Sequence, residues 1–72
     1  MAIHIQTSGS LQTHLPAGVT LTDVRTAGEA IERLRLPRDT SLVIMVNGRL
    51  ADWSTQLHDG DVLQLVPAIG GG

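Results

Sequence analysis

An unbroken apolar stretch, Leu42-Val43-Ile44-Met45-Val46, constrains the fold of this sequence more than any other feature. It is rich in β-branched residues, which favours a strand. A strand that is apolar on both faces lies at the centre of a sheet with cover on both sides, or keeps one face for a partner. The sequence therefore predicts a sheet with a central strand at this position, and both explanations of its second apolar face stay open.

Other segments show the alternation or the turn signals that are typical of strands. The first two predicted strands form a hairpin across Ser8-Gly9-Ser10, and Pro16-Ala17-Gly18 closes it. Asn47-Gly48 favours a tight hairpin turn after the apolar stretch. Another turn is predicted at Asp59-Gly60-Asp61. Besides 42–46, the predicted strands cover residues 3–6, 11–15, 49–50 and 62–66.

One helix is predicted between these strands, over residues 21–35. Thr20 is the expected N-cap, with Asp23 as its acidic partner three residues later. Pro37 ends the helix because proline cannot continue the hydrogen-bond ladder. Gly28 lies inside the helix, where glycine costs about 1 kcal/mol relative to alanine. Apolar residues at spacings of three and four form one helix face: Val24, Ala27, Ile31 and Leu34.

The order of elements is strand, strand, helix, strand, short strand, strand. A chain of 72 residues buries such elements most easily as a mixed sheet of four to five strands with the helix packed across one face. This is an α+β fold of the β-grasp, ubiquitin-like type, expected over residues 1–67, with residues 68–72 as a flexible C-terminal glycine tail. Alternation predicts these helix-facing strand residues: Ile3, Ile5, Leu11, Leu15, Leu42, Ile44, Val46, Leu63 and Leu65.

The opposite face of the predicted sheet mixes apolar and polar side chains. Val43, Met45 and Val66 on this face indicate a surface on which a partner protein docks. An ordinary solvated sheet face is the alternative. Alternation predicts these residues for the outer face: His4, His14, Val43, Met45, Gln64 and Val66.

Composition argues against several classes of function. Cysteine is absent, which excludes disulfides, a cysteine-zinc site and a thiol nucleophile. A net charge of −2, with five arginines spread along the chain, disfavours nucleic-acid binding, and the single aromatic residue, Trp53, leaves no platform for base stacking. Lysine is also absent, so no side chain of this protein can receive an isopeptide bond. No stretch resembles a signal peptide or a membrane span, so a soluble cytoplasmic protein is expected.

The titratable residues predict no metal site and no intrinsic catalytic site. His4, His14 and His58 lie on separate predicted elements, whereas a metal site needs ligands that converge. Asp59 and Asp61 flank a glycine and fit a turn better than a pair of acid–base catalysts.

Trp53 and the arginines near the end of the predicted helix also have structural explanations. Trp53 is expected to be a loop residue packed over the sheet edge. The arginine cluster either steers an acidic partner or is a solvated helix end that the helix dipole favours: Arg33, Arg35 and Arg38.

The sequence ends with Gly70-Gly71-Gly72, directly after a predicted strand. Glycine lacks a Cβ, so such a thread can pass through a channel that is too narrow for other residues. An unbranched carboxylate at its end suits delivery into the active site of another protein. A frayed terminus is the alternative, because disorder concentrates at chain ends.

Three motifs in this order make the sequence resemble the ubiquitin-like sulfur carriers of the MoaD and ThiS family. They are Val46-Asn47-Gly48-Arg49, then Leu57-His58-Asp59-Gly60-Asp61-Val62, then the segment from Val66 to the terminal glycines. Residues 18–24 also resemble the stretch that leads into the helix of this family, so the resemblance covers essentially the whole chain. Two features depart from the family pattern: a third terminal glycine, and the lack of an aromatic residue before the tail. The third glycine lengthens the reach of the tail, and the missing aromatic residue leaves the cofactor pathway open.

The resemblance implies that the chain is a protein cosubstrate and not an enzyme. Gly72 would be adenylated and then converted to a thiocarboxylate, with Gly70 and Gly71 threading the partner's active site. The implied partners are an adenylating enzyme that resembles E1 enzymes, a sulfur donor, and the large subunit of molybdopterin synthase or thiazole synthase. This chain has no phosphate-binding loop, so ATP and Mg²⁺ are expected on the activating partner. The alternative is a ubiquitin-like modifier or interaction module conjugated through Gly72.

Overall fold

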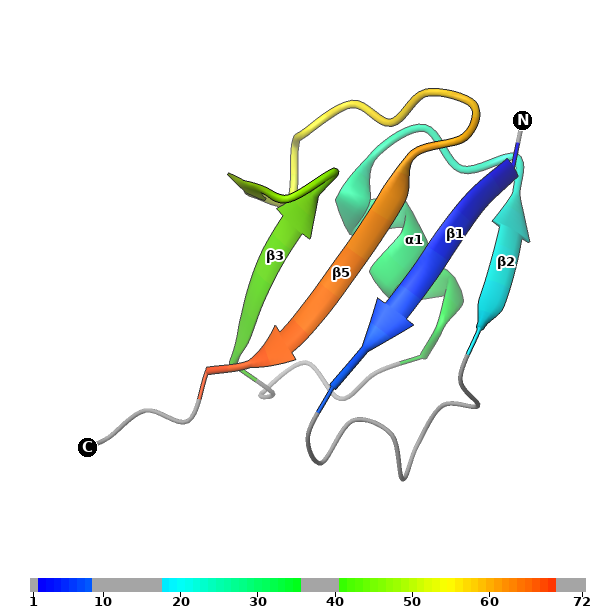
Figure 1. Cartoon of the computed structure of the whole chain (residues 1–72). Coiled ribbons are helices and arrows are strands. Elements are labelled where there is room, and N and C mark those ends of the chain that lie inside the picture. Colours follow the sequence, from blue (N-terminus) through cyan, green and yellow to red (C-terminus); the bar gives the residue numbers. More distant parts are fainter. Residues whose placement is uncertain (1, 9–17, 36–40, 69–72) are drawn as a thin grey trace.

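In the computed structural model, the described residues form one mixed sheet, and a helix crosses one of its faces (Figure 1). The structure describes residues 2–8, 18–35 and 41–68. The sheet order is β2-β1-β5-β3-β4, in which β1 and β5 are parallel and the other neighbours are antiparallel. The α+β fold of the β-grasp type is therefore confirmed, with five strands. The elements are β1 (Ala2–Thr7), β2 (Val19–Thr22), α1 (Ala27–Arg33), β3 (Leu42–Val46), β4 (Arg49–Ala51) and β5 (Val62–Pro67).

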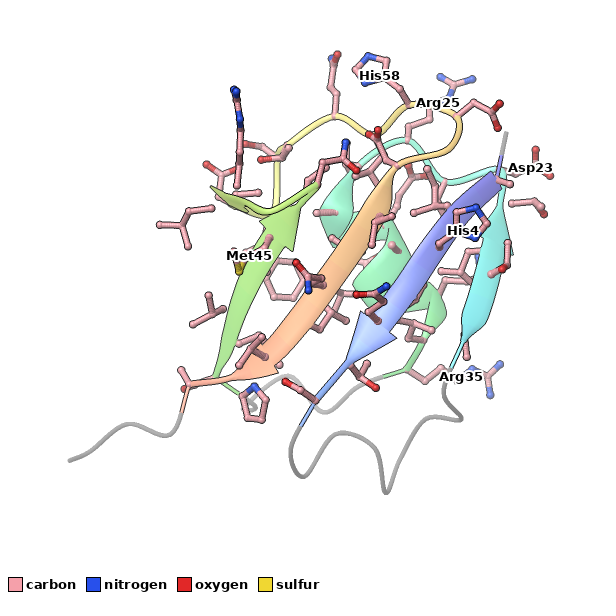
Figure 2. All side chains as sticks on the ribbon, in the orientation of Figure 1. His4, Asp23, Arg25, Arg35, Met45 and His58 are labelled. Atoms are coloured by element: carbon pink, nitrogen blue, oxygen red, sulfur yellow. The ribbon has the colours of Figure 1, made fainter. Side chains whose placement is uncertain are left out.

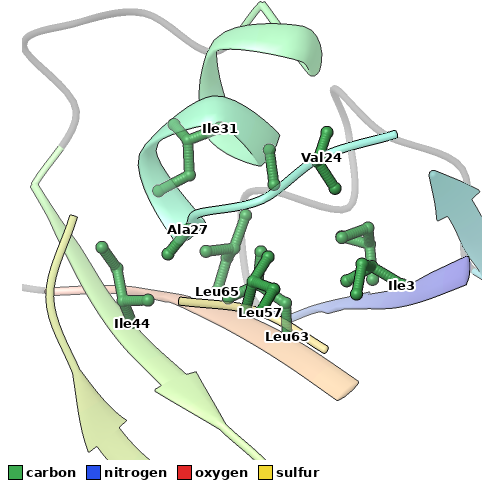
Figure 3. Packing of buried hydrophobic residues seen from close by; sticks show 10 residues of the cluster. Ile3, Val24, Ala27, Ile31, Ile44, Leu57, Leu63 and Leu65 are labelled. Carbon is green, nitrogen blue, oxygen red and sulfur yellow. The ribbon is translucent and has the colours of Figure 1, made fainter. Parts of the chain in front are cut away.

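The core lies between the helix and one face of the sheet, and aliphatic side chains fill it (Figure 3). Register brings Ile5 beside Leu63 and Ile44 beside Leu65, so the helix-facing residues of three adjacent strands meet. The strand alternation predicted for the described residues is thus confirmed, whereas Leu11 and Leu15 lie outside them. Alternation did not reveal Ala30 or the loop residue Leu57. The buried residues are Ile3, Ile5, Val24, Ala27, Ala30, Ile31, Ile44, Leu57, Leu63 and Leu65.

The start of the helix was predicted wrongly. Residues 19–22 form β2, in which Leu21 pairs with Ile3, and Thr20 is a strand residue rather than an N-cap. The observed N-cap is Thr26, whose hydroxyl accepts a hydrogen bond from the Glu29 N–H at 3.2 Å. Glu29 reaches back to accept one from the backbone N–H of Arg25 at 2.8 Å. A threonine followed three residues later by glutamate satisfies the free N–H groups at a helix start better than one followed by aspartate.

Gly28 lies where the helix and the Trp53 segment approach each other closely. Its backbone N–H donates to the carbonyl oxygen of Trp53 at 2.9 Å. A Cβ at position 28 would lie 2.9 Å from the same oxygen and 3.2 Å from an atom of the Trp53 ring. Trp53 therefore packs against the first turn of the helix rather than over the sheet edge. This close approach of two segments is a tertiary contact that propensity does not include.

The predicted turn at Asn47-Gly48 is confirmed. Both residues have positive φ, 52° at Asn47 and 82° at Gly48, as a type I′ turn requires. The turn sets the register Val46 with Arg49 and Met45 with Leu50. The short strand that follows extends one residue further than predicted, to Ala51.

Replacing Gly28 with alanine tests whether the close approach of Trp53 outweighs the helix propensity that alanine would add. We expect Gly28→Ala to lower the free energy of unfolding by about 1–3 kcal/mol, because the methyl group forces Trp53 away from the helix. Helix propensity alone predicts a gain of about 1 kcal/mol. Urea denaturation followed by Trp53 fluorescence measures the sign, and Glu32→Ala on the exposed side of the same helix is the control. A stabilised Gly28→Ala protein would show that the close approach has no energetic weight.

Candidate functional site

The C-terminal segment leaves the protein from the central strand β5. Pro67, the last residue of β5, pairs with Leu42 of β3. The N–H of Ala68 still donates to the carbonyl of Ser41 at 2.9 Å, so the backbone is held as far as residue 68. Gly70, Gly71 and Gly72 lie outside the described residues, and their role as a thread and a reactive terminus stays a prediction.

Apolar side chains lie on the outer face of the sheet next to this exit. Val43 and Val66 are direct cross-strand partners, and Met45 follows two residues along β3 on the same face (Figure 2). All three are half-buried. The structure thus brings together the three predicted docking residues, although their role in docking stays a prediction.

Leu50 belongs to the same cluster and was missed by the sequence analysis. It pairs with Met45 across β3 and β4, and it is 79% exposed. The signal was present, because the Asn47-Gly48 turn fixes the register that places Leu50 opposite Met45. We call Val43, Met45, Leu50 and Val66 the apolar patch.

Apart from Val62, the outer-face strand residues beside this patch on β5, β1 and β2 carry polar side chains. The amide of Gln64 donates to the side-chain oxygen of Gln6 at 3.3 Å, across β5 and β1. The hydroxyl of Thr20 lies 3.5 Å from Nδ1 of His4, across β2 and β1. The outer face is therefore divided, with the apolar patch over β3, β4 and the end of β5, and hydrogen-bonding side chains over β1 and β2.

At the other end of β5, the turn around Asp59 and Asp61 ties three segments together. The Asp59 carboxylate accepts the backbone N–H of Ala2 at 2.7 Å. The two oxygens of Asp61 accept the backbone N–H of His58 at 2.8 Å and the amide of Asn47 at 2.9 Å. The predicted turn is confirmed. Both carboxylates act as hydrogen-bond acceptors that hold the chain together.

Hydrogen bonding makes Asp61 more acidic than a free aspartate. The backbone N–H of His58 lowers its pKa most, followed by the side chain of Asn47, and desolvation opposes this shift only in part. The carboxylate side chain is 14% exposed and lies 3.8 Å from the His58 ring, which is 78% exposed. These bonds favour the charged form of Asp61.

The histidines and arginines do not converge in the described part of the chain. His4 lies on β1 and His58 in the turn before β5, while His14 and Arg38 lie outside the described residues. No group of three metal-ligating side chains is found among residues 2–8, 18–35 and 41–68. The Arg33 guanidinium donates a hydrogen bond to the carbonyl oxygen of Thr22 at 3.3 Å, which joins the helix to the edge strand β2. None of the described helices is long and apolar enough to cross a bilayer.

Comparisons with known proteins place this geometry in context. A family model described as "ThiS family" matches residues 6–72. SAMP1 from Haloferax volcanii is 22% identical with a TM-score of 0.80, and each chain is covered in full. A chain in the complex of subunits 1 and 2 of molybdopterin-converting factor from Helicobacter pylori is 23% identical with a TM-score of 0.73, again with full coverage of both chains. Urm1 from Trypanosoma brucei is 15% identical with a TM-score of 0.72, covering 99% of this chain and 95% of that one. No curated protein matches the chain.

The pKa of Asp61 predicts how stability depends on pH. Because the folded-state pKa is lowered, the contribution of Asp61 is fully present above the unfolded value of about 3.9 and is lost as the pH falls through the folded value. We expect Asp61→Asn to lower the free energy of unfolding by about 1–3 kcal/mol near neutral pH, with the difference from wild type shrinking below about pH 4. Urea denaturation between pH 7 and pH 2 measures both curves. If the difference in free energy of unfolding between wild type and Asp61→Asn stayed constant from pH 7 to pH 2, the lowered pKa of Asp61 would be contradicted.

Proposed function

Since the chain belongs to the ThiS family, we propose that it is a sulfur carrier whose C-terminal carboxylate, on Gly72, is activated as an adenylate and converted to a thiocarboxylate. The thiocarboxylate then donates sulfur in the biosynthesis of a cofactor, either molybdopterin or the thiazole of thiamine. The chain acts as a protein cosubstrate and does not itself catalyse the reaction. Gly70 and Gly71 form the thread that enters the partner's active site.

The position of the apolar patch beside the C-terminal exit carries this proposal. Ala68 is bonded to Ser41, one residue before β3, and Val66 faces Val43 directly. Even fully extended, residues 69–72 span at most about 14 Å. A catalytic centre that acts on Gly72 must therefore come this close to Ala68. A partner of ordinary size would then cover Val43 and Val66, and an apolar surface at that point stabilises the complex.

The chemistry divides between the two proteins. A carboxylate is a poor electrophile until one oxygen becomes part of a good leaving group. In the proposed reaction the Gly72 carboxylate attacks the α-phosphate of ATP and releases pyrophosphate. Hydrosulfide supplied by a sulfur donor then attacks the acyl carbon, and the bond to AMP breaks to leave the thiocarboxylate. An adenylating enzyme that resembles E1 enzymes binds ATP and Mg²⁺. This chain supplies the nucleophile for the first step and fixes its position through the docked sheet.

The recipient of the sulfur is proposed to be a synthase subunit, either thiazole synthase or the large subunit of molybdopterin synthase. The Helicobacter pylori structure named above is a complex of two subunits of molybdopterin-converting factor, so a protein of this fold is found paired with a second subunit. A second candidate function is a modifier conjugated through Gly72 to a lysine of a target protein. A modifier needs the same adenylation and the same glycine thread as a sulfur carrier. The two functions differ in whether the adenylate then reacts with sulfur or with a lysine amine.

Intact-protein mass spectrometry distinguishes these outcomes. The chain is incubated with ATP, Mg²⁺, a cognate adenylating enzyme and a sulfur donor, beside a variant that lacks Gly71 and Gly72. We expect a mass gain equal to the replacement of one oxygen by sulfur, and none in the truncated variant. An amide-linked adduct would support the modifier, and no gain with an enzyme that is active on another carrier would overturn both candidates.

A charge placed in the apolar patch tests the docking surface. We expect Val43→Asp to slow thiocarboxylate formation by about tenfold or more, because the complex would bury an unpaired carboxylate. Thr20→Asp places the same charge on the polar part of the same face and is the control. Thermal denaturation of both variants shows whether each remains folded. Equal rates for a folded Val43→Asp protein and the control would exclude the apolar patch as the docking site.

A further inference from the structure

The sheet ends in two edge strands, β2 and β4, and the backbone of β4 is open at one residue. The N–H of Asn47 donates to Val62, so the backbone groups of Val43 and Met45 point toward β5, and those of Ile44 and Val46 point toward β4. Leu50 is the partner of Met45. Its N–H and C=O therefore point away from β3, out of the sheet. Neither group has a hydrogen-bond partner among the described residues.

The other edge is guarded at one of its two outward-facing residues, Thr22, whereas the backbone groups of Thr20, which pairs with His4, have no hydrogen-bond partner among the described residues. The N–H of His4 donates to Asp61, so the even-numbered residues of β1 bond toward β5. The backbone groups of Thr22, which pairs with Ala2, consequently face outward from β2. Arg33 of the helix donates to the carbonyl of Thr22 at 3.3 Å. Native sheets commonly protect an edge with a charged side chain in this way. Within residues 2–8, 18–35 and 41–68, no side chain donates such a bond to the β4 edge.

The side chain of the open residue is unusual for an unprotected edge. Leu50 is 79% exposed, more than any other large hydrophobic side chain in the described part of the chain. Arg49 is also exposed, and no ion pair or hydrogen bond of its guanidinium is found within the described ranges.

We propose that the β4 edge binds an extended peptide strand of a partner protein, which carries an apolar side chain opposite Leu50 and an acidic side chain next to it. The residue opposite Leu50 would exchange two backbone hydrogen bonds with it. Alternation puts the side chain of that residue on the outer face, beside Leu50 and Met45, and puts its neighbours on the face of Arg49. An acidic neighbour pairs with the free Arg49 guanidinium.

The expected interaction is local and weak. One residue of a strand of three offers its backbone groups to the edge, so the added strand gains two backbone hydrogen bonds there. Strand addition of this kind takes its affinity from main-chain bonds and its selectivity from the alternating side chains. Leu50 and Arg49 therefore decide which segments bind.

The outward backbone groups of this edge are separate from the proposed use of the C-terminus, although the side chain of Leu50 belongs to the apolar patch. The glycine tail leaves from β5, and β4 lies on the other side of β3. A partner strand on β4 and an enzyme at the tail approach different boundaries of the sheet. The inference holds whether or not the carboxylate of Gly72 is activated, and its test uses neither ATP nor an activating enzyme.

A synthetic peptide is the probe for the edge. We suggest a blocked peptide of nine residues in which valine and glutamate alternate, titrated into the ¹⁵N-labelled full chain. The expected result is saturable binding that shifts the amide signal of Leu50 and slows its hydrogen exchange. A peptide with lysine in place of glutamate should bind at least about tenfold more weakly, because it faces Arg49 with a like charge.

Two substitutions at position 50 separate backbone pairing from side-chain contact. Leu50→Ala keeps the outward N–H and should weaken binding only a few-fold, whereas Leu50→Pro removes it and should weaken binding by about tenfold or more. Proline is tolerated at an outward-facing position of an edge strand. If Leu50→Pro fails to fold, a chemically synthesised chain with N-methylleucine at position 50 removes the same N–H and keeps the side chain.

Three results would overturn the proposal. The first is equal binding by the wild type and the N-methylated chain. The second is a set of signal shifts centred on Val43 and Val66 instead of Leu50, which would place the peptide over β3 and β5 rather than at the β4 edge. The third is the absence of peptide binding together with slowed Leu50 exchange at high protein concentration, which would identify a second copy of this chain as the occupant.

Discussion

The parallel pairing of the first and last strands is the constraint on which the rest of this structure depends. β1 and β5 are far apart in the chain and adjacent in the sheet, with Ile5 beside Leu63. This pairing makes β5 a central strand, with β3 on its other side. Its inward side chains Leu63 and Leu65 are fully buried. The strand that leads to the C-terminus is consequently one of the best-held segments of the protein.

Polar groups at the start of β5 hold the strand in register. Asp61 joins the turn before β5 to Asn47, and the side-chain oxygen of Asn47 accepts the N–H of Val62 at 2.9 Å. Asp59 fixes the beginning of β1 through Ala2. These bonds lie at one end of β5 and the chain leaves from the other end. The polar network therefore sets the position of the C-terminal exit without taking part in the proposed chemistry.

The two proposed contact surfaces follow from the same sheet order. Within the described residues the helix covers one face of the sheet only, and the second face is apolar over β3 and the end of β5, where the chain exits. The order also leaves β4 at an edge, where the tight turn at Asn47-Gly48 orients Leu50 outward. Turn geometry thus determines both the side chain that Leu50 adds to the apolar patch and the backbone groups that it presents at the edge.

The sequence by itself determined the fold class, most of the core and the Asn47-Gly48 and Asp59-Gly60-Asp61 turns. Period-two alternation and turn chemistry are local signals, and Ile3, Ile5, Ile44, Leu63 and Leu65 are buried as the alternation predicted. The start of the helix and the environment of Gly28 depend on contacts between segments that are distant in the sequence, so only the tertiary structure decided them. Residues 19–22 resemble a route into a helix until β1 offers them a partner strand, and Gly28 looks unfavourable until Trp53 packs against it. The edge at Leu50 is of the same kind, because the direction of a backbone N–H follows from its neighbouring strand and not from the residue itself.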